Sequence, residues 1–446
     1  IKYNFENFQG FIGHMPFLVI SNVEDAKRVL LNWKEFPKAA GLIRYPYMEQ
    51  FLGQNLVFVN HEQWRMQRSI MNPAFYNIDR FSPLFARETF KCIKGMQSFS
   101  DQFGVLTVPI AEFTTGLALD VLGLAAFKYE FNLLATASKG NLHTSNTSSE
   151  YIDAYHYVIA NLSDIKFVVG GEWYPMIPTE QNRKMQLSIA KMNDLVYSLI
   201  EKAKQNKLKN AGADAGEESL LDMMIDSTDE ESGKKFTEEE LRSNILIFFL
   251  AGHDTTSASL AAALYSIAKN PRVQNKLIEE IDTMLGKDLS IPLDIEAVKN
   301  LQYLGWVIKE TLRMYPPVVT VPGRTVQKNN ETIGNIKVKK GSLIGISVYN
   351  IHHNPAYWDE PMEFRPERFS EEESKGRPSM AWIPFGGGAR LCIGNNFSLL
   401  EQRIFLSALL QRYTIELPNP KAPYKFLKNG ILMSPDPTML ITFKPR

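Results

Sequence analysis

The sequence predicts a mainly α-helical protein with a small amount of β-sheet. Over most of the 446 residues, apolar positions recur at the three- and four-residue spacing of amphipathic helices, whereas strand-like alternation is limited to Phe17–Ile20 and Ile333–Val348. Asn244–Ile267 is apolar almost throughout and long enough for a central helix. Apolar residues make up 44% of the chain and charged residues 22%, which excludes collagen-like, disordered and disulfide-scaffold proteins.

Net charge and cysteine content indicate which partners and which cellular compartment to expect. The 49 basic and 49 acidic side chains cancel, so no overall field attracts a polyanion and we expect no nucleic-acid partner. The chain has only two cysteines, Cys92 and Cys392, which favours a reducing compartment.

Two polar segments, Ala137–Glu150 and Lys202–Glu240, are predicted to be exposed connectors. Helical patterns flank both, so neither has the character of a domain linker. The proline-rich Tyr315–Pro322 marks the end of a helix that leads into a strand. We therefore expect a single catalytic domain over residues 1–446.

Asn244–Ile267 has the length of a membrane-spanning helix. However, Asp254, Thr255 and Thr256 lie in its middle, where they would be costly in a bilayer. A buried core helix is the better interpretation.

A glycine-rich segment, Phe385–Gly394 (FGGGARLCIG), contains Cys392 and precedes a helical pattern. The positive end of a helix dipole favours the thiolate, which is a soft, electron-rich ligand. The glycines leave room for a flat, bulky group. Considered alone, the segment is equally compatible with a simple helix cap and a buried structural cysteine.

The segment matches Phe-x-x-Gly-x-Arg-x-Cys-x-Gly at every fixed position and resembles the haem-binding loop of the cytochrome P450 family. The resemblance implies the family's triangular helical bundle with small sheets. It also implies haem b (iron protoporphyrin IX), with Cys392 as the proximal iron ligand. Phe385 would pack beside the sulfur, and Gly386 and Gly394 would border the haem.

Two further segments occur in the family's order. Glu310 and Arg313 share a helix face before a pair of prolines, and Arg368 of FRPERF would complete a buried supporting network. The same Glu-x-x-Arg spacing also occurs in other places, such as Glu62 and Arg65, where an exposed ion pair is the usual explanation.

The sequence AGHDTT, Ala251–Thr256, resembles the family's oxygen-activating motif. By that resemblance, Ala251 borders the haem, Thr255 hydrogen-bonds to dioxygen and Asp254 relays protons. An incidental polar kink is the alternative.

Four side chains are candidates for binding the haem carboxylates. Trp64 and Arg68 are four residues apart on an expected helix, so that their N–H groups project together. Arg324 and Arg390 match two further arginines of many relatives. For each arginine alone, a surface ion pair is the alternative.

The resemblance also suggests substrate and partners. Substrate-pocket positions would be Phe249, Val318, Val321 and Leu432, the last within a turn at Ile431–Met433. Because these side chains are apolar, we expect a lipophilic substrate such as a fatty acid, steroid or terpenoid. Electrons would come from NADPH through a separate flavoprotein reductase, docking on a basic patch that includes Arg65 and Arg403.

The expected enzyme is a monooxygenase of the eukaryotic microsomal type, an oxidoreductase that inserts one atom of O2 into a C–H bond. A peroxide isomerase or lyase and a non-catalytic haem sensor are the alternatives. The N-terminal sequence IKYNFENFQG contains neither a signal peptide nor an anchor. An anchor removed from a protein of the endoplasmic reticulum membrane, facing the cytosol, would explain this, and a soluble cytoplasmic protein is the alternative.

Overall fold

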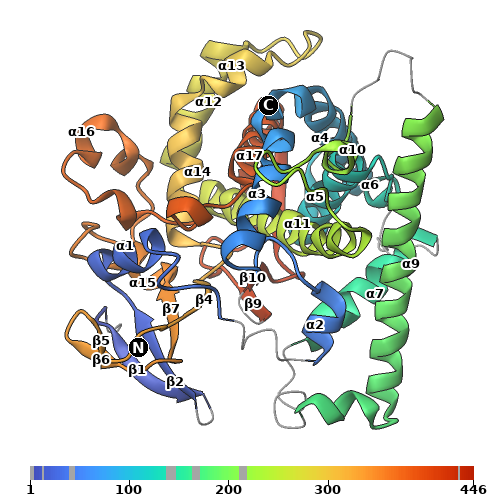
Figure 1. Ribbon diagram of the computed structural model, residues 1–446. Helices are drawn as coiled ribbons and strands as arrows, with labels where there is room; N and C mark the ends of the chain where they lie inside the picture. Colours follow the sequence, from blue (N-terminus) through green and yellow to red (C-terminus); the bar gives the residue numbers. More distant parts are fainter. Residues whose placement is uncertain are drawn as a thin grey trace. The chain divides into compact units, whose positions relative to one another are not determined.

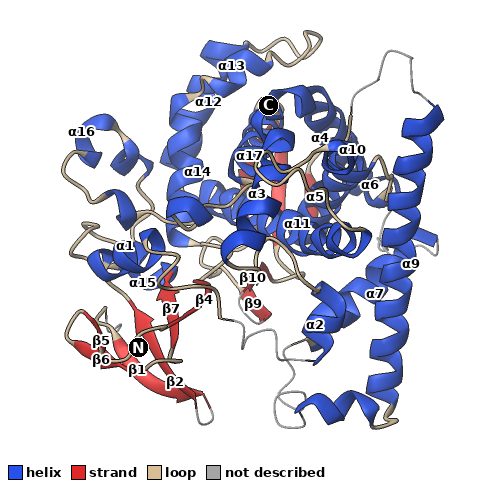
Figure 2. Ribbon diagram, viewed as in Figure 1, coloured by secondary structure: helices blue, strands red, loops and turns tan. Residues whose placement is uncertain are grey.

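The computed structural model describes residues 5–12, 15–39, 46–136, 147–162, 171–209, 218–429 and 432–446. Helices account for most of this part of the chain, and the strands are short (Figures 1 and 2). The predicted mainly α class is therefore confirmed. The strands expected around Phe17–Ile20 and Ile333–Val348 are also present.

The chain divides into two compact units, each assembled from separate segments. The first comprises Ile1–Lys38, Phe85–Thr115 and Thr255–Arg446, and the second comprises Ala39–Leu84 and Gly116–Asp254. Three of the boundaries fall inside continuous helices, namely α4 (Ser82–Met96), α5 (Ile110–Phe127) and α11 (Glu238–Lys269). None of these three boundaries is therefore a linker. The expectation of one catalytic domain stays a prediction.

Among the described residues, the first unit contains all the strands, the C-terminal helices, the start of α5 and the second half of α11. Its elements are β1 (Phe8–Ile12), β2 (Met15–Ile20), α1 (Val23–Leu31), most of α4 (Ser82–Met96), η3 (Gln97–Phe99), β3 (Leu106–Pro109), α12 (Pro271–Leu285), α13 (Ile295–Lys299), α14 (Gln302–Met314), β4 (Thr320–Thr325), β5 (Glu331–Ile333), β6 (Ile336–Val338), β7 (Leu343–Ser347), α15 (Val348–His353), η5 (Pro366–Phe369), α16 (Glu371–Ser374), η6 (Ser379–Ala381), η7 (Gly388–Arg390), α17 (Asn395–Leu410), β8 (Tyr413–Glu416), β9 (Phe426–Asn429), β10 (Leu432–Pro435) and β11 (Leu440–Pro445).

All the regular elements in the described residues of the second unit are helical. Its elements are α2 (Pro46–Leu52), α3 (His61–Tyr76), η2 (Ile78–Phe81), α6 (Leu133–Thr136), α7 (Thr147–Asn161), η4 (Gly171–Met176), α9 (Glu180–Lys209) and α10 (Leu220–Asp226), together with most of α5 and the first half of α11.

The main sheet has the strand order β1-β2-β7-β4. β2 pairs in parallel with β7, and the other two pairings are antiparallel. Alternate residues of these strands, including Leu18, Ile20, Ile344 and Ile346, are buried in one apolar cluster that α1 helps to cover. A second sheet, β3-β11-β8, and two hairpins complete the β structure.

The second predicted connector is partly wrong. Within Lys202–Glu240, α9 continues to Lys209 and a further helix, α10, begins after a capping box of Ser219 and Asp222. α10 is stable because it buries Leu220, Leu221 and Met224. Of the first connector, Ala137–Asn146 lies outside the described residues, and Thr147–Glu150 forms the start of α7.

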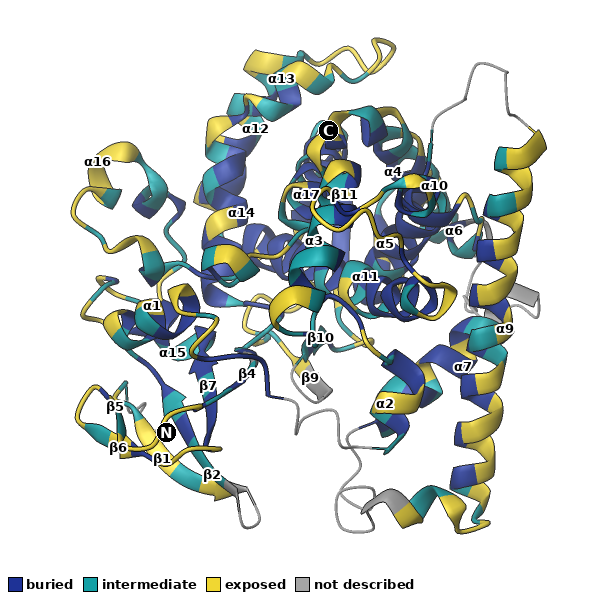
Figure 3. Cartoon of the chain, viewed as in Figure 1, coloured by how far each residue is buried: buried dark blue, intermediate teal, exposed yellow. Residues whose placement is uncertain are grey.

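In the part of the chain that the structure describes, two helices, α5 and α11, have the length and apolar composition of a membrane span. Of their most apolar windows, 83% and 72% respectively are buried within the protein. α9 by contrast alternates buried and exposed residues along its length, as a surface helix does (Figure 3). The burial of α11 agrees with its interpretation as a core helix.

Candidate functional site

Cys392 lies on an open loop just before α17. The residue is exposed, and its backbone N–H donates a hydrogen bond to the carbonyl oxygen of Phe385 at 3.0 Å. α17 begins at Asn395 with Gly394 as its N-cap, and no side chain caps it. The positive helix end is therefore directed at the cysteine loop, as predicted, and favours the thiolate.

Two glycines of this loop are needed for different reasons. Gly386 has a φ of +74°, and a Cβ there would have no heavy atom within 4 Å, so the residue borders open space. Gly388 has a φ of +66°, and a Cβ there would lie 2.8 Å from the carbonyl oxygen of Leu30. Of these two glycines, Gly386 fits the expectation that the glycines leave room for a bound group, and Gly388 does not.

Buried cations gather in the same unit. Arg324 is 1% exposed, its Nη1 donates to the Phe36 carbonyl at 3.3 Å, and its Nε has no hydrogen-bond partner among the described residues. Lys38 is also buried. Burial, together with the charges of Arg324 and Arg390, holds the pKa of the Lys38 ammonium well below its usual range. Three neighbouring cations favour an anionic ligand.

These features fit haem b. The family's haem needs a sulfur ligand beside open space and cations near its carboxylates. The first unit supplies an exposed Cys392 and unobstructed space at Gly386 and Gly394. It also supplies the buried cations Arg324 and Lys38. Lys38 was missed from the sequence because a lone lysine carries no signal of burial. The isolated β-bridge between Lys38 and Arg324 brings it there.

One face of α11 is accessible near the middle of the helix, although His253 and Thr256 in the same stretch are buried. Ala251 is exposed, and Asp254 and Thr255 are half-buried, whereas the stretch Ala258–Ala268 is buried. Ser259 Oγ donates to the carbonyl oxygen of Thr255 at 2.9 Å. This face of α11 therefore presents the polar motif to an accessible space.

Asp254 is held by two neighbours. Tyr155 on α7 donates a hydrogen bond from its hydroxyl to Oδ2 at 2.8 Å, and His253 Nε2 lies 3.1 Å from Oδ1. Burial opposes ionisation of Asp254, but the charge and hydrogen bond of His253 and the Tyr155 hydroxyl outweigh it and lower the pKa of the carboxyl. Asp254 is therefore an anion at neutral pH.

Glu310, Arg313 and Arg368 form one buried network. Arg313 donates from Nε to Glu310 Oε2 at 2.7 Å and from Nη2 to Oε1 at 2.8 Å, and Arg368 Nε lies 3.3 Å from Oε1. Arg313 Nη1 also donates to the carbonyls of His352 and Pro361. The network thus ties α14 to the segments that lead to the cysteine loop.

The other Glu-x-x-Arg copies differ from this one. Arg65 pairs with Glu62 and with Glu231 on the surface. Arg242 is buried, but it donates to Asn193 and to the Gln50 carbonyl instead of Glu239. Identical spacing therefore gives three different environments, which tertiary contacts decide.

The remaining predicted residues are placed as follows. Trp64 (6% exposed) and Arg68 (half-buried) lie four residues apart on α3, in the second unit. Val318 forms an isolated β-bridge with Leu432, which brings two proposed pocket positions together. Ile431 lies outside the described residues.

Phe249 lies in an aromatic cluster in the second unit. Its ring stacks on Phe127 at a centroid distance of 5.0 Å and meets Phe131 edge-on at 5.7 Å. The side chain is only 3% exposed. Val321, on β4, is 8% exposed.

Arg403 has internal partners. Its Nη1 donates to the carbonyl of Leu301 at 2.8 Å and to that of Val298 at 3.4 Å. These bonds give Arg403 a structural role, and its membership of the docking patch stays a prediction.

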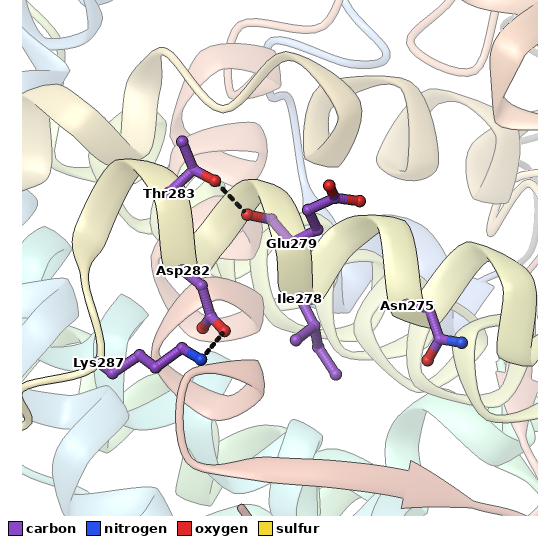
Figure 4. A pocket seen from close by; sticks show the side chains of 6 residues that line it. All are labelled: Asn275, Ile278, Glu279, Asp282, Thr283 and Lys287. Carbon is purple, nitrogen blue, oxygen red and sulfur yellow. Dashed lines mark hydrogen bonds and ion pairs between the residues drawn. The ribbon is translucent and has the colours of Figure 1, made fainter.

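A separate depression lies on α12. It has a volume of about 440 Å³ and is lined by Asn275, Ile278, Glu279, Asp282, Thr283 and Lys287 (Figure 4). Asp282 pairs there with Lys287 and with the C-terminal residue Arg446. None of the predicted site residues lines this depression.

Comparisons with known proteins agree with this geometry. The family model described as "Cytochrome P450" matches residues 2–442. Cytochrome P450 4V2 of Homo sapiens is 29% identical over 98% of this chain and 82% of its own length. Echinocystic acid 23-monooxygenase of Saponaria officinalis is 29% identical over 91% of this chain and 76% of its own length.

A solved structure shows the same fold. The crystal structure of the cytochrome P450DA heme domain superposes with a TM-score of 0.81 over 99% of this chain and 89% of that chain, at 22% identity. At that identity, the similarity concerns the fold alone.

Proposed function

The chain belongs to the cytochrome P450 family and is a haem-thiolate monooxygenase, and we propose that it inserts one oxygen atom from O2 into a C–H bond of a lipophilic substrate. The observation that carries this proposal is the exposed Cys392 at the positive end of α17, beside open space at Gly386 and Gly394. A buried structural cysteine would have a packed environment, as Cys92 has.

When bound, the haem supplies the redox chemistry. The side chains of the protein bind the haem and deliver protons. Cys392 would hold the iron as its thiolate. Arg324, Arg390 and Lys38 would hold the haem carboxylates in the first unit, and Trp64 and Arg68 are proposed for the same task from α3. Phe385 and Ala251 would border the haem.

Asp254 and Thr255 would deliver protons. Thr255 offers a hydroxyl that both donates and accepts, and Asp254 is the adjacent half-buried acid. The network of Glu310, Arg313 and Arg368 supports the fold rather than the reaction. This division of roles requires Thr255 to be dispensable for folding and needed for coupling electron use to product.

Four apolar positions are proposed for the substrate pocket: Phe249, Val318, Val321 and Leu432. The bridge between Val318 and Leu432 supports two of them. A pocket of such side chains favours fatty acids, steroids or terpenoids, because a polar substrate would lose hydration there without gaining hydrogen bonds.

Electrons would come from NADPH through a separate flavoprotein reductase. We propose a location at the endoplasmic reticulum membrane on its cytosolic face, supported by the similarity to cytochrome P450 4V2. Arg65 stays a candidate for the reductase patch, although it is paired with Glu62 and Glu231.

The ferrous carbon monoxide complex tests the iron ligand. We expect a strongly red-shifted Soret band in the wild type and its loss in Cys392→Ser, with Cys92→Ser as the matched control. A wild-type band typical of a nitrogen ligand would refute the proposal.

Thr255→Ala tests proton delivery. Product formed per NADPH should fall and peroxide release should rise, while the carbon monoxide spectrum stays unchanged. An unchanged yield without extra peroxide would show that Thr255 has no such role. Optical shifts on adding fatty acids, steroids and terpenoids to the ferric protein would then narrow the substrate class.

A further inference from the structure

Asp254 is surrounded by side chains that the proposed function leaves without a role. Tyr155 is 3% exposed and His253 is fully buried, and each faces a different oxygen of the Asp254 carboxylate. The rings of Tyr155 and His253 also meet edge-on at a centroid distance of 5.2 Å. The three side chains therefore form one buried cluster between α7 and α11.

The hydrogen bonds define the protonation state of His253. Its Nδ1 contacts the carbonyl oxygen of Phe249, which can only accept, so Nδ1 carries a proton. Its Nε2 lies 3.1 Å from Asp254 Oδ1. This is an ion-pair distance without hydrogen-bond geometry. An imidazolium attracts the carboxylate at this distance, whereas a neutral ring protonated on Nδ1 brings the Nε2 lone pair close to the carboxylate. The contact is thus attractive only when His253 is protonated.

The titration behaviour of the cluster agrees with this geometry. Burial opposes the charged form of His253, but Asp254 and the Phe249 carbonyl outweigh burial and raise the pKa of the ring. Burial and Asp254 both raise the pKa of the Tyr155 hydroxyl, which stays neutral. His156, the next residue on α7, is the other ionisable group that acts on Asp254.

We propose that Tyr155 and His253 are positioning residues that hold Asp254 in place through its two carboxylate oxygens. How firmly the carboxylate is held depends on whether His253 is protonated. Tyr155 fixes Oδ2 at any pH below its own ionisation. His253 fixes Oδ1 only as the imidazolium, and on losing its proton it releases that oxygen. The inference rests on the proposed proton-relay role of Asp254 and goes beyond it.

Coupling of NADPH use to product should therefore depend on pH through His253. At low pH the carboxylate is held at both oxygens. As pH rises through the pKa of His253, the contact with Oδ1 turns repulsive, whereas the Tyr155 hydrogen bond to Oδ2 is kept. Tyr155→Phe removes that hydrogen bond while keeping the buried ring.

Histidine NMR in the diamagnetic ferrous carbon monoxide complex tests the cluster without turnover. The His253 ring signals are assigned by their loss in His253→Gln. In the wild type the titration midpoint should lie above 6.5. In Asp254→Asn it should fall by about one pH unit or more, a tenfold loss of proton affinity, because burial is then unopposed. An unmoved midpoint would overturn the proposal.

Peroxide released per NADPH tests the positioning role. We expect Tyr155→Phe to raise it severalfold and to steepen its rise with pH. Tyr157→Phe is the matched control, since it removes the same hydroxyl two residues away on α7, where the partner is the Gln181 carbonyl at 3.5 Å. Tyr155→Phe behaving like Tyr157→Phe would overturn the positioning role.

Thr255→Ala separates this inference from the proposed function. If Thr255→Ala raises peroxide release but Tyr155→Phe does not, the relay stands and the positioning role fails. If neither does, the relay itself is wrong, whatever the His253 titration shows.

Discussion

Thr256 Oγ1 lies 2.9 Å from Ser398 Oγ, and this hydrogen bond joins the AGHDTT helix to the helix that follows Cys392. Gln402 Nε2 donates to the same Ser398 hydroxyl at 3.1 Å. All three side chains are buried or nearly so. Thr256 therefore ties α11 to α17, whereas its neighbour Thr255 is half-buried on the accessible part of α11.

Removing either hydroxyl of that bond should loosen α11 from α17. Ser398→Ala or Thr256→Val should lower the free energy of unfolding by about 1–3 kcal/mol, because the partner hydroxyl is left buried. Denaturant unfolding of the single and double variants measures the coupling between them. Ser407→Ala is the control, since that buried hydroxyl bonds only to the Ile404 carbonyl of its own helix. Strict additivity of Ser398→Ala and Thr256→Val would contradict the finding.

Glu310→Gln should be strongly destabilising. Glu310 is fully buried and pairs with Arg313 at 2.7 Å, so removing its charge leaves two buried guanidiniums without their anion. We expect a loss of about 3–5 kcal/mol in the free energy of unfolding. Glu62→Gln removes the same Glu-x-x-Arg pair at an exposed position and should cost less than about 1 kcal/mol. Equal losses in the two variants would refute a special role for the buried network.

Stability should fall with rising pH because of Glu401. This carboxyl is 2% exposed, and burial raises its pKa from 4.5 to about 8. The folded protein keeps a proton that the unfolded chain loses, so the stabilisation is complete below pH 4.5 and is lost as pH rises to 8. The slope approaches about 1.4 kcal/mol per pH unit.

Unfolding measured between pH 5 and 9 checks the contribution of Glu401. Glu401→Gln should flatten the profile, whereas Glu416→Gln, at a half-exposed position paired with Lys444, should leave it unchanged. A profile that keeps its slope in Glu401→Gln would assign the dependence to another group.

Haem retention should depend on the buried cations. Arg324→Gln removes a buried charge that has no acidic partner among the described residues. We expect haem transfer to an acceptor globin to accelerate about 30-fold. This factor is equivalent to about 2 kcal/mol, as for a charge-assisted hydrogen bond. Lys328→Gln is the control, because it removes an exposed cation paired with Glu35. Equal transfer rates in Arg324→Gln and wild type would exclude Arg324 from the haem site.

Removal of the haem should change the contribution that Lys38 makes to stability. Without an anion between them, Lys38, Arg324 and Arg390 repel one another. Lys38→Met should therefore stabilise the haem-free protein, which thermal unfolding measures. The same substitution should weaken haem retention, which the rate of haem transfer measures. A variant that is destabilised in the haem-free state would contradict this account.

Local patterns were sufficient for much of the site. The cysteine loop, AGHDTT and Glu310 with Arg313 each lie within a few residues of one another, so helical spacing and backbone conformation alone bring their side chains together. The mainly α class and the burial of α11 follow from apolar spacing in the same way. α10 was missed because its short apolar stretch is surrounded by charged residues, and only packing stabilises so short a helix.

Tertiary structure decided the rest. Tyr155 lies 99 residues before Asp254, and Lys38 meets Arg324 only through a bridge between distant segments. No local spacing encodes such contacts, because they depend on which helix faces pack. The sequence by itself determined the cysteine loop, the polar motif and the helical class, whereas the packed fold determined which charges are buried together. The physical reason is that a pKa and an ion pair depend on desolvation and on neighbours in space, and neither is a property of the residue alone.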